Sequence, residues 1–136
     1  MVSAVTNQGR LNFMVFKERF DTKVFLEFLR RLVRQNSRKV YLIVDRHPVH
    51  RSKRVKKWVE TNAQKIRLIF LPGYSPELNP DELLNHDVKS NAVGKKRSHN
   101  QEELISHVRG YLRKRQMQPQ VVQRYFLEKH VRYAAA

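Results

Sequence analysis

The chain has 136 residues, of which 28 are lysine or arginine and 12 are aspartate or glutamate, giving a formal net charge of +16. It contains no cysteine, which excludes disulfides, zinc ribbons and thiol catalysis. No apolar run approaches the roughly 20 residues that span a bilayer, and no signal peptide is visible. We therefore expect a soluble intracellular protein of one domain, residues 1–136, with nucleic acid as the first candidate partner and an anionic membrane as the second.

The N-terminal part predicts a hairpin followed by a helix. Residues 1–16 form two apolar stretches around the turn-forming cluster Asn7-Gln8-Gly9, which is typical of a β-hairpin. Apolar residues then recur at helical spacing over Thr22–Gln35. Asp21 or Thr22 can cap the start of this helix.

A strand, a helix and a strand follow. Val40–Val44 is a continuous apolar run, which indicates a strand buried on both faces, as in parallel sheets. A helix over residues 52–62 and a strand over 66–71 complete a βαβ unit. Beyond a rigid, proline-rich loop, the pattern predicts a helix from about Pro80 and two more helices. These last two cover residues 101–115 and 119–129.

Two acids stand where chemistry is possible. Asp45 follows the strand at its carboxyl end, where open α/β sheets place ligands, although it could merely begin a turn with residues 46–48. Glu82 is the third residue of a helix start with Asn79 as N-cap. Locally, a capping box with Glu82 folded back onto the Asn79 amide is the favoured interpretation, and a functional role is compatible with it.

Other chemically suggestive side chains have simpler interpretations. His47 and His50 lack the further ligands of a zinc site, so His50 is expected to pack or hydrogen-bond near the following helix. Trp58 and Tyr111 fall on apolar helical faces and are predicted to belong to the core.

Basic residues are so numerous that phosphate contact is the better interpretation of their runs, although charge runs are usually solvated faces. Binding through them should be independent of DNA sequence and strongly salt-dependent. For Arg46, which follows Asp45 directly, a solvent-facing arginine is slightly favoured over a phosphate contact. The candidate DNA-binding residues are Arg46, Arg51, Lys53, Arg54, Lys56, Lys57, Lys95, Lys96 and Arg97.

A longer motif surrounds the two acids. Residues 74–82, Tyr-Ser-Pro-Glu-Leu-Asn-Pro-Asp-Glu, closely resemble the third catalytic block of Tc/mariner-like and related bacterial insertion-sequence transposases, Y-S-P-x-L-N-P-x-E. Residues 44–50 resemble the second block, a strand ending in Asp and followed by Pro and His. Asp45 and Glu82 are 37 positions apart (82 − 45), near the spacing of that family. The resemblance extends over nearly the whole chain.

The resemblance implies an α/β fold of the ribonuclease H-like kind, a mixed sheet with flanking helices. It also implies metal-dependent DNA cleavage and strand transfer in the complete enzyme, with Asp45 and Glu82 as catalytic ligands of Mg²⁺ or Mn²⁺. Hard carboxylate oxygens suit both ions. The expected location is the bacterial cytoplasm, at the nucleoid.

The chain also departs from the family pattern. The family's first Asp lies on a central strand that precedes the hairpin, and we expect that strand and the upstream DNA-binding region to be missing. A fragment of this kind should be inert alone, and its unpaired strand edges could support a homodimer. The alternatives are a catalytically inert remnant that binds DNA or an intact transposase, and a basic structural protein of the nucleoid or ribosome.

Overall fold

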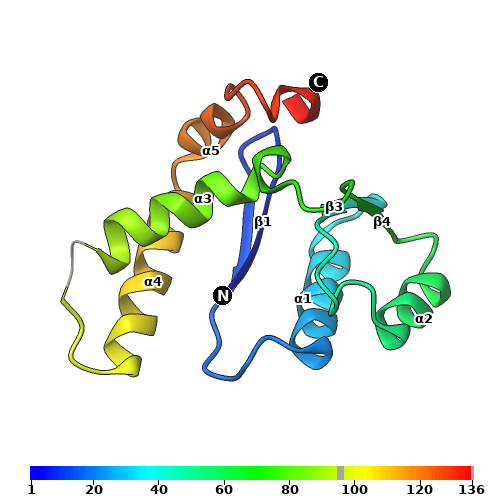
Figure 1. Ribbon diagram of the computed structural model, residues 1–136, viewed down its shortest axis with the longest axis horizontal. Coiled ribbons are helices and arrows are strands. Elements are labelled where there is room, and N and C mark those ends of the chain that lie inside the picture. The colour runs from blue at the N-terminus through cyan, green and yellow to red at the C-terminus, as the bar shows by residue number, and fades with distance from the viewer. Residues whose placement is uncertain (95–96, 136) are drawn as a thin grey trace. The chain divides into compact units, whose positions relative to one another are not determined.

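The computed structural model describes residues 1–94 and 97–135, which form two compact units (Figure 1). The central unit is Arg19–Asn79. The terminal unit combines Met1–Glu18 with the chain from Pro80 onward. The expectation of a single domain stays a prediction, and each unit is described by itself.

The central unit is the predicted βαβ arrangement preceded by a helix. Strands β3 and β4 are parallel, with Val40 opposite Ile66 at one end of the ladder. Asp21 caps α1 by accepting a hydrogen bond from the Val24 amide, and Ser52 caps α2 in the same way. The elements are α1 (Thr22–Gln35), β3 (Val40–Val44), α2 (Lys53–Thr61), β4 (Ile66–Phe70) and the 3₁₀ turn η1 (Pro76–Leu78).

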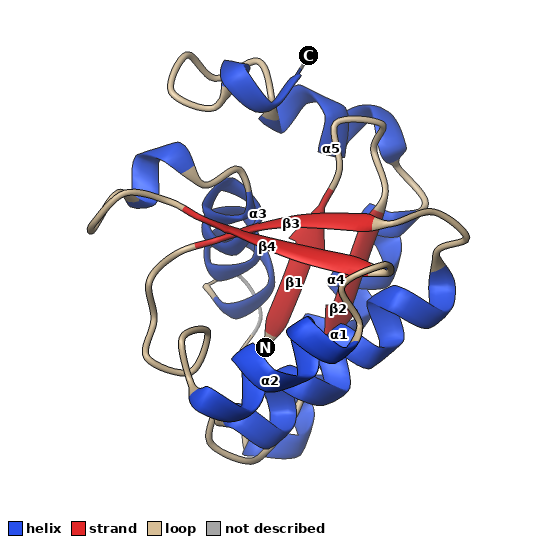
Figure 2. Ribbon diagram, turned by 90° about the vertical axis from the view of Figure 1, so that its right-hand side faces the viewer, coloured by secondary structure: helices blue, strands red, loops and turns tan. Residues whose placement is uncertain are grey.

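The β3–β4 pair is covered on one face, so the prediction of a strand buried on both faces was wrong. Helices α1 and α2 lie on the same side of the pair in both views (Figures 1 and 2). Val44 and Ile66 are buried, whereas Tyr41 and Ile69, on the opposite face, are 60% and 42% exposed. A continuous apolar run shows that both faces are apolar but does not show that both are covered.

The outer edge of β3 is also unpaired. The Val40 amide donates to the Lys65 carbonyl at 2.9 Å, and Val44 accepts from the Leu71 amide at 2.8 Å. In a parallel ladder, the peptide groups of alternate residues face alternate edges, so those of Tyr41 and Ile43 point away from β4. Within the described ranges, no strand pairs with that edge.

Trp58 does not join the core of the central unit as predicted. Val55, three residues earlier on α2, is fully buried, but Trp58 is only partly buried. Its side chain lines a cleft instead. Helical periodicity places Trp58 on the same face as Val55, but the indole lies near the end of the helix, where that face meets solvent.

The terminal unit packs the hairpin against three helices around an apolar core. Strands β1 and β2 are antiparallel, and α3 continues as a π-helical turn, η2. The core contains Leu11, Leu84, Val88, Ala92, Val108, Leu112 and Val122. The elements are β1 (Val2–Val5), β2 (Leu11–Met14), α3 (Asp81–Val88), η2 (Lys89–Val93), α4 (Gln101–Gln116), α5 (Pro119–Tyr125) and η3 (Arg132–Ala135).

Helix α5 ends at Tyr125, four residues before the predicted end of the 119–129 helix. The amides of Phe126 and Leu127 donate to the carbonyls three residues earlier, so the backbone here has 3₁₀-type hydrogen bonds and the α-helix ends. Phe126 is thereby buried, and Tyr125 faces α3.

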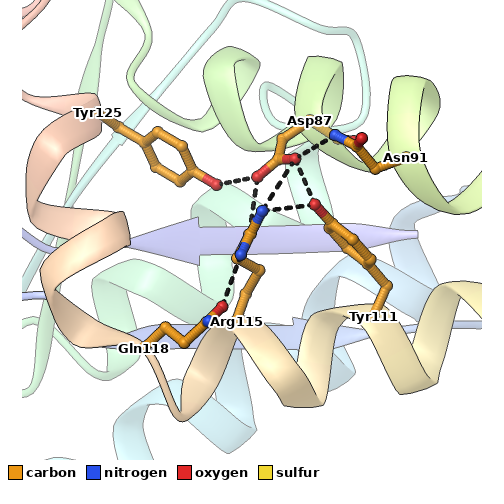
Figure 3. Close-up of polar contacts among 6 residues, drawn as sticks. All are labelled: Asp87, Asn91, Tyr111, Arg115, Gln118 and Tyr125. Carbon is orange, nitrogen blue, oxygen red and sulfur yellow. Dashed lines mark hydrogen bonds and ion pairs between the residues drawn. The ribbon is translucent and has the colours of Figure 1, made fainter.

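One carboxylate joins the helices of the terminal unit (Figure 3). Asp87, on α3, accepts hydrogen bonds from the hydroxyls of Tyr111 and Tyr125, both at 2.5 Å. It also accepts from Arg115 Nε at 2.9 Å and from Asn91 Nδ2 at 2.8 Å. A single side chain of α3 is thus bonded to η2, α4 and α5.

These hydrogen bonds determine the charge state of the network. Burial alone would raise the pKa of Asp87, but the hydrogen bonds from Arg115, Tyr111 and Tyr125 outweigh it and hold that pKa well below its usual range. Burial and the hydrogen bond to Asp87 raise the pKa of both tyrosines. The side chains of Asp87 and Arg115 are 13% and 18% exposed, so the pair is largely desolvated.

The Asp87→Asn variant should destabilise the terminal unit by about 3 kcal/mol, because Arg115 would keep a buried charge without its partner. Since the pKa of Asp87 is lower in the folded chain, its contribution is present above about pH 4 and is lost as the pH falls further. Amide hydrogen exchange in α4 measures both effects. The exposed Glu18→Gln change should stay within about 0.5 kcal/mol of wild type. A pH-independent difference between Asp87→Asn and wild type would contradict this account.

Two glycines of the terminal unit should respond oppositely to alanine. Gly9 has φ +91°, and a Cβ there would lie 2.5 Å from the Pro119 carbonyl oxygen. Gly9→Ala should therefore cost more than about 1 kcal/mol. Gly110, inside α4, has no atom within 4 Å of an added Cβ, so Gly110→Ala should stabilise by about 0.5–1 kcal/mol. Urea unfolding of both variants tests these two predictions. If both substitutions changed the free energy of unfolding in the same direction, the packing of the hairpin turn on α5 would be refuted.

Candidate functional site

Asp45 follows β3 at the carboxyl end of the sheet. Its side chain is 47% exposed, and Oδ1 accepts a hydrogen bond from the His47 amide at 2.9 Å. His50 Nδ1 lies 3.0 Å from the same oxygen. Asp45 therefore does begin a turn, as its simpler interpretation required. Its other oxygen, Oδ2, has no hydrogen-bond partner within residues 1–94 and 97–135, so one lone-pair face stays available.

His50 is a packed histidine that orients Asp45. Its ring centroid lies 4.5 Å from that of Phe25 and 5.9 Å from that of Phe20. Burial lowers the pKa of His50, while the hydrogen bond to the Asp45 carbonyl opposes that shift. Packing was expected, but the contact is with α1 rather than with the following helix. In the part of the chain that the structure describes, no three His, Asp or Glu side chains form a metal-binding cluster.

Glu82 lies in the first turn of α3 and is exposed. The N-cap position is occupied by Pro80 instead of the predicted Asn79, and Pro80 makes no capping hydrogen bond. Asn79 instead closes the preceding 3₁₀ turn, with its amide donating to the Pro76 carbonyl at 3.0 Å. The capping box is therefore absent, and the Glu82 carboxylate has no hydrogen-bond partner among the described residues.

The start of α3 is held by a neighbour of Glu82. The Ser3 hydroxyl, on β1, donates to the Asp81 carboxylate at 2.7 Å. Further along α3, Asp87 bonds to α4 and α5. Both ends of the helix that carries Glu82 are therefore tied to the terminal unit.

The structure places the two candidate acids in different units. Asp45 belongs to the central unit and Glu82 to the terminal unit, so neither unit alone contains both. Each presents carboxylate oxygens, the donor type that Mg²⁺ and Mn²⁺ prefer, so the residues suit such an ion chemically. Their joint role as catalytic metal ligands stays a prediction.

The candidate DNA-binding residues differ in their surroundings. Arg46 is exposed, yet its Nε donates to the Leu71 carbonyl at 3.0 Å and joins the ends of β3 and β4. Arg51 Nε donates to the Arg46 carbonyl at 2.9 Å. Lys95 and Lys96 lie outside the described residues. The exposed members with no hydrogen bond from the side chain to another described residue are Lys53, Arg54, Lys56, Lys57 and Arg97.

Sequence reasoning missed the residues that fix α3. Tyr111 was predicted to be a core residue, and it does pack partly against the core, but its hydroxyl binds Asp87. Polar pairs four residues apart, Asp87 with Asn91 and Tyr111 with Arg115, were the available signal. Such pairs share one helical face and can meet a partner together.

Comparisons with known proteins assign the family. Residues 1–105 match the family described as DDE superfamily endonuclease. Among solved structures, the catalytic domain of Mos1 mariner transposase is similar, with a TM-score of 0.58 and 17% identity over 95% of this chain and 70% of that chain. No curated protein sequence matches the chain. No helix of the described residues is long and apolar enough to cross a membrane. The fold is thus α/β and ribonuclease H-like, as predicted, although the described strands form two two-stranded sheets instead of one mixed sheet. The chain belongs to the DDE superfamily endonucleases.

Proposed function

We propose that this chain forms part of the catalytic domain of a DNA transposase that cleaves and joins strands with divalent metal ions. Asp45 and Glu82 are the metal ligands. The observation that carries this proposal is the state of these two acids: each is held at an element end and has an oxygen free of hydrogen bonds. Family membership supports phosphodiester bonds as the substrate class.

Other residues of the chain position and orient the two proposed metal ligands. The His47 amide and the His50 ring hold Asp45 Oδ1, which directs Oδ2 away from the turn. The Asp87 network keeps α3, and hence Glu82, fixed in the terminal unit. When bound, a divalent ion supplies Lewis-acid polarisation of a phosphoryl oxygen and activation of a water or a 3′-hydroxyl. The exposed lysines and arginines of α2, which follows Asp45 in the chain, neutralise DNA phosphates.

Mn²⁺ binding, measured by calorimetry, tests the proposed ligands. Asp45→Asn and Glu82→Gln should each weaken binding by about tenfold or more, because each removes a charged oxygen donor. Glu60→Gln on α2 and Glu18→Gln after β2 are matched controls in the two units, and both residues are exposed. They should leave the affinity unchanged.

The outcome separates two functions. Binding lost in both acid variants and kept in both controls supports the metal-dependent enzyme. If Mn²⁺ does not bind, or if neither acid variant changes its affinity, the result favours the alternative of a catalytically inert chain that binds DNA or an intact transposase. That alternative draws on the net charge of +16 and on the exposed basic residues alone.

We further propose that the open edge of β3 pairs with a second copy of the chain. The outward-facing peptide groups of Tyr41 and Ile43 offer donors and acceptors, and Tyr41 adds an exposed apolar side chain. Exposed edges of this kind are ready templates for another strand.

Sedimentation velocity at increasing concentration should therefore show a dimer. Tyr41→Pro should suppress it, since proline removes an outward-facing N–H and leaves the ladder to β4 intact. Tyr41→Thr loses the same ring but keeps the N–H, so it should still associate. A monomer at all concentrations, or equal association of both variants, would exclude pairing through β3.

A further inference from the structure

A cleft of about 680 Å³ lies in the central unit at the end of the sheet opposite Asp45. Lys39 and Lys65, which line it, immediately precede β3 and β4, whereas Asp45 follows β3. Since β3 has five residues, the cleft and Asp45 are separated by about 16 Å along the strand. Nothing in the proposed metal chemistry requires this cleft.

The lining of the cleft is strongly cationic. Arg30, Arg34, Arg38, Lys39 and Lys65 face a single acid, Glu27. Glu27 already forms ion pairs, because its carboxylate lies 3.3 Å from Arg31 Nε and 3.9 Å from Arg30 Nη1.

Three of these cations lack a partner. Arg34, Arg38 and Lys65 make no side-chain hydrogen bond or ion pair to any other residue that the structure describes. The position of Arg34 near the end of α1 accounts for a cation there, because positive charge is favourable at a helix C-terminus. The same reason does not account for the positive charges of Arg38 and Lys65, which lie outside the helices. Like charges around a concave surface focus a positive potential that attracts anions.

An aromatic side chain adds a second kind of contact. Trp58, on α2, is the chain's only tryptophan and lines the same cleft with part of its surface exposed. Indole rings beside cations are the usual platform for unpaired nucleobases, because any base can stack there while phosphates meet the charges.

We infer that this cleft binds single-stranded nucleic acid, with phosphates on Arg34, Arg38 and Lys65 and an unpaired base against Trp58. A duplex keeps its bases stacked on one another, so only a single strand can satisfy the ring and the charges together. The cleft has the size of a small-ligand pocket and holds a short stretch of a strand. This cleft lies apart from Asp45, the metal-binding acid of the same unit, and it extends the proposed function to strands that have been unpaired.

The fluorescence of Trp58 reports the site directly. In metal-free buffer with a chelator, an oligothymidylate of about eight nucleotides should quench it. An abasic oligomer of equal length should bind more weakly and quench little. Arg34→Gln combined with Arg38→Gln should lower the slope of log affinity against log salt by about 1.4, the value for two phosphate contacts on a single strand.

A matched control removes two cations from another helix end. Arg113→Gln with Lys114→Gln changes the last turn of α4, in the terminal unit, and should leave quenching and affinity unchanged. Asp45→Asn should also bind the oligomer like wild type, so failure of the metal site and failure of this cleft are distinguishable.

Three results would overturn the inference. The first is equal quenching by the abasic oligomer, since it excludes a base on Trp58. The second is an equal loss of affinity in the two double variants, because binding would then follow net charge alone. The third is quenching by anionic lipid vesicles without quenching by the oligomer, which would make the cleft a membrane contact.

Discussion

The buried carboxylate of Asp87 is the interaction on which the terminal unit depends. Helix α3 has only eight residues, and its N-cap residue, Pro80, makes no capping hydrogen bond, so the helix has little stability of its own. Asp87 supplies the missing constraint, because Arg115 and Tyr125 approach it from α4 and α5. A desolvated carboxylate is costly unless every lone pair is used, and here four side chains use them. The exposed Glu82 can therefore sit on a helix whose position is fixed elsewhere.

Local sequence patterns predicted the bounds of helices and strands better than they predicted which faces of these elements are covered. The bounds of α1 agree with the prediction, because an amphipathic repeat and the Asp21 cap are both local signals. The coverage of β3 could not be predicted, since an apolar strand looks the same whether one face or two are covered. The capping box predicted at Asn79 failed because the 3₁₀ turn takes the Asn79 backbone N–H, which donates to the Pro76 carbonyl and not to Glu82. The motifs predicted Asp45 and Glu82 as site residues, and that role stays a prediction. The Asp87 network left only two local pairs as a signal, because its contacts between helices join residues distant in sequence.

The central unit separates its charges along the strands. At the carboxyl end, Asp45 offers an oxygen to a cation, and at the opposite end the cleft around Arg34 and Trp58 offers charge and a ring to an anion. Cations also occur at the Asp45 end, where Arg51 donates to the Arg46 carbonyl and Arg46 itself directly follows Asp45. Its Nε is bound to the Leu71 carbonyl, which holds the guanidinium along the strand ends. A cation that bonds to the residue after β4 is thereby held next to the acid, with no ion pair to it among the described residues.

The two candidate acids are fixed by means that differ in range. Asp45 is held by His47 and His50, within six residues of chain, so its orientation depends on one turn and its packing on α1. Glu82 is held indirectly, through contacts that Asp87 makes with residues as far along the chain as Tyr125. Changes in the C-terminal helices should therefore disturb Glu82 and leave Asp45 as it is. Substitutions in α4 and α5 should thus impair an enzyme that needs both acids, although these helices are distant from both acids in sequence.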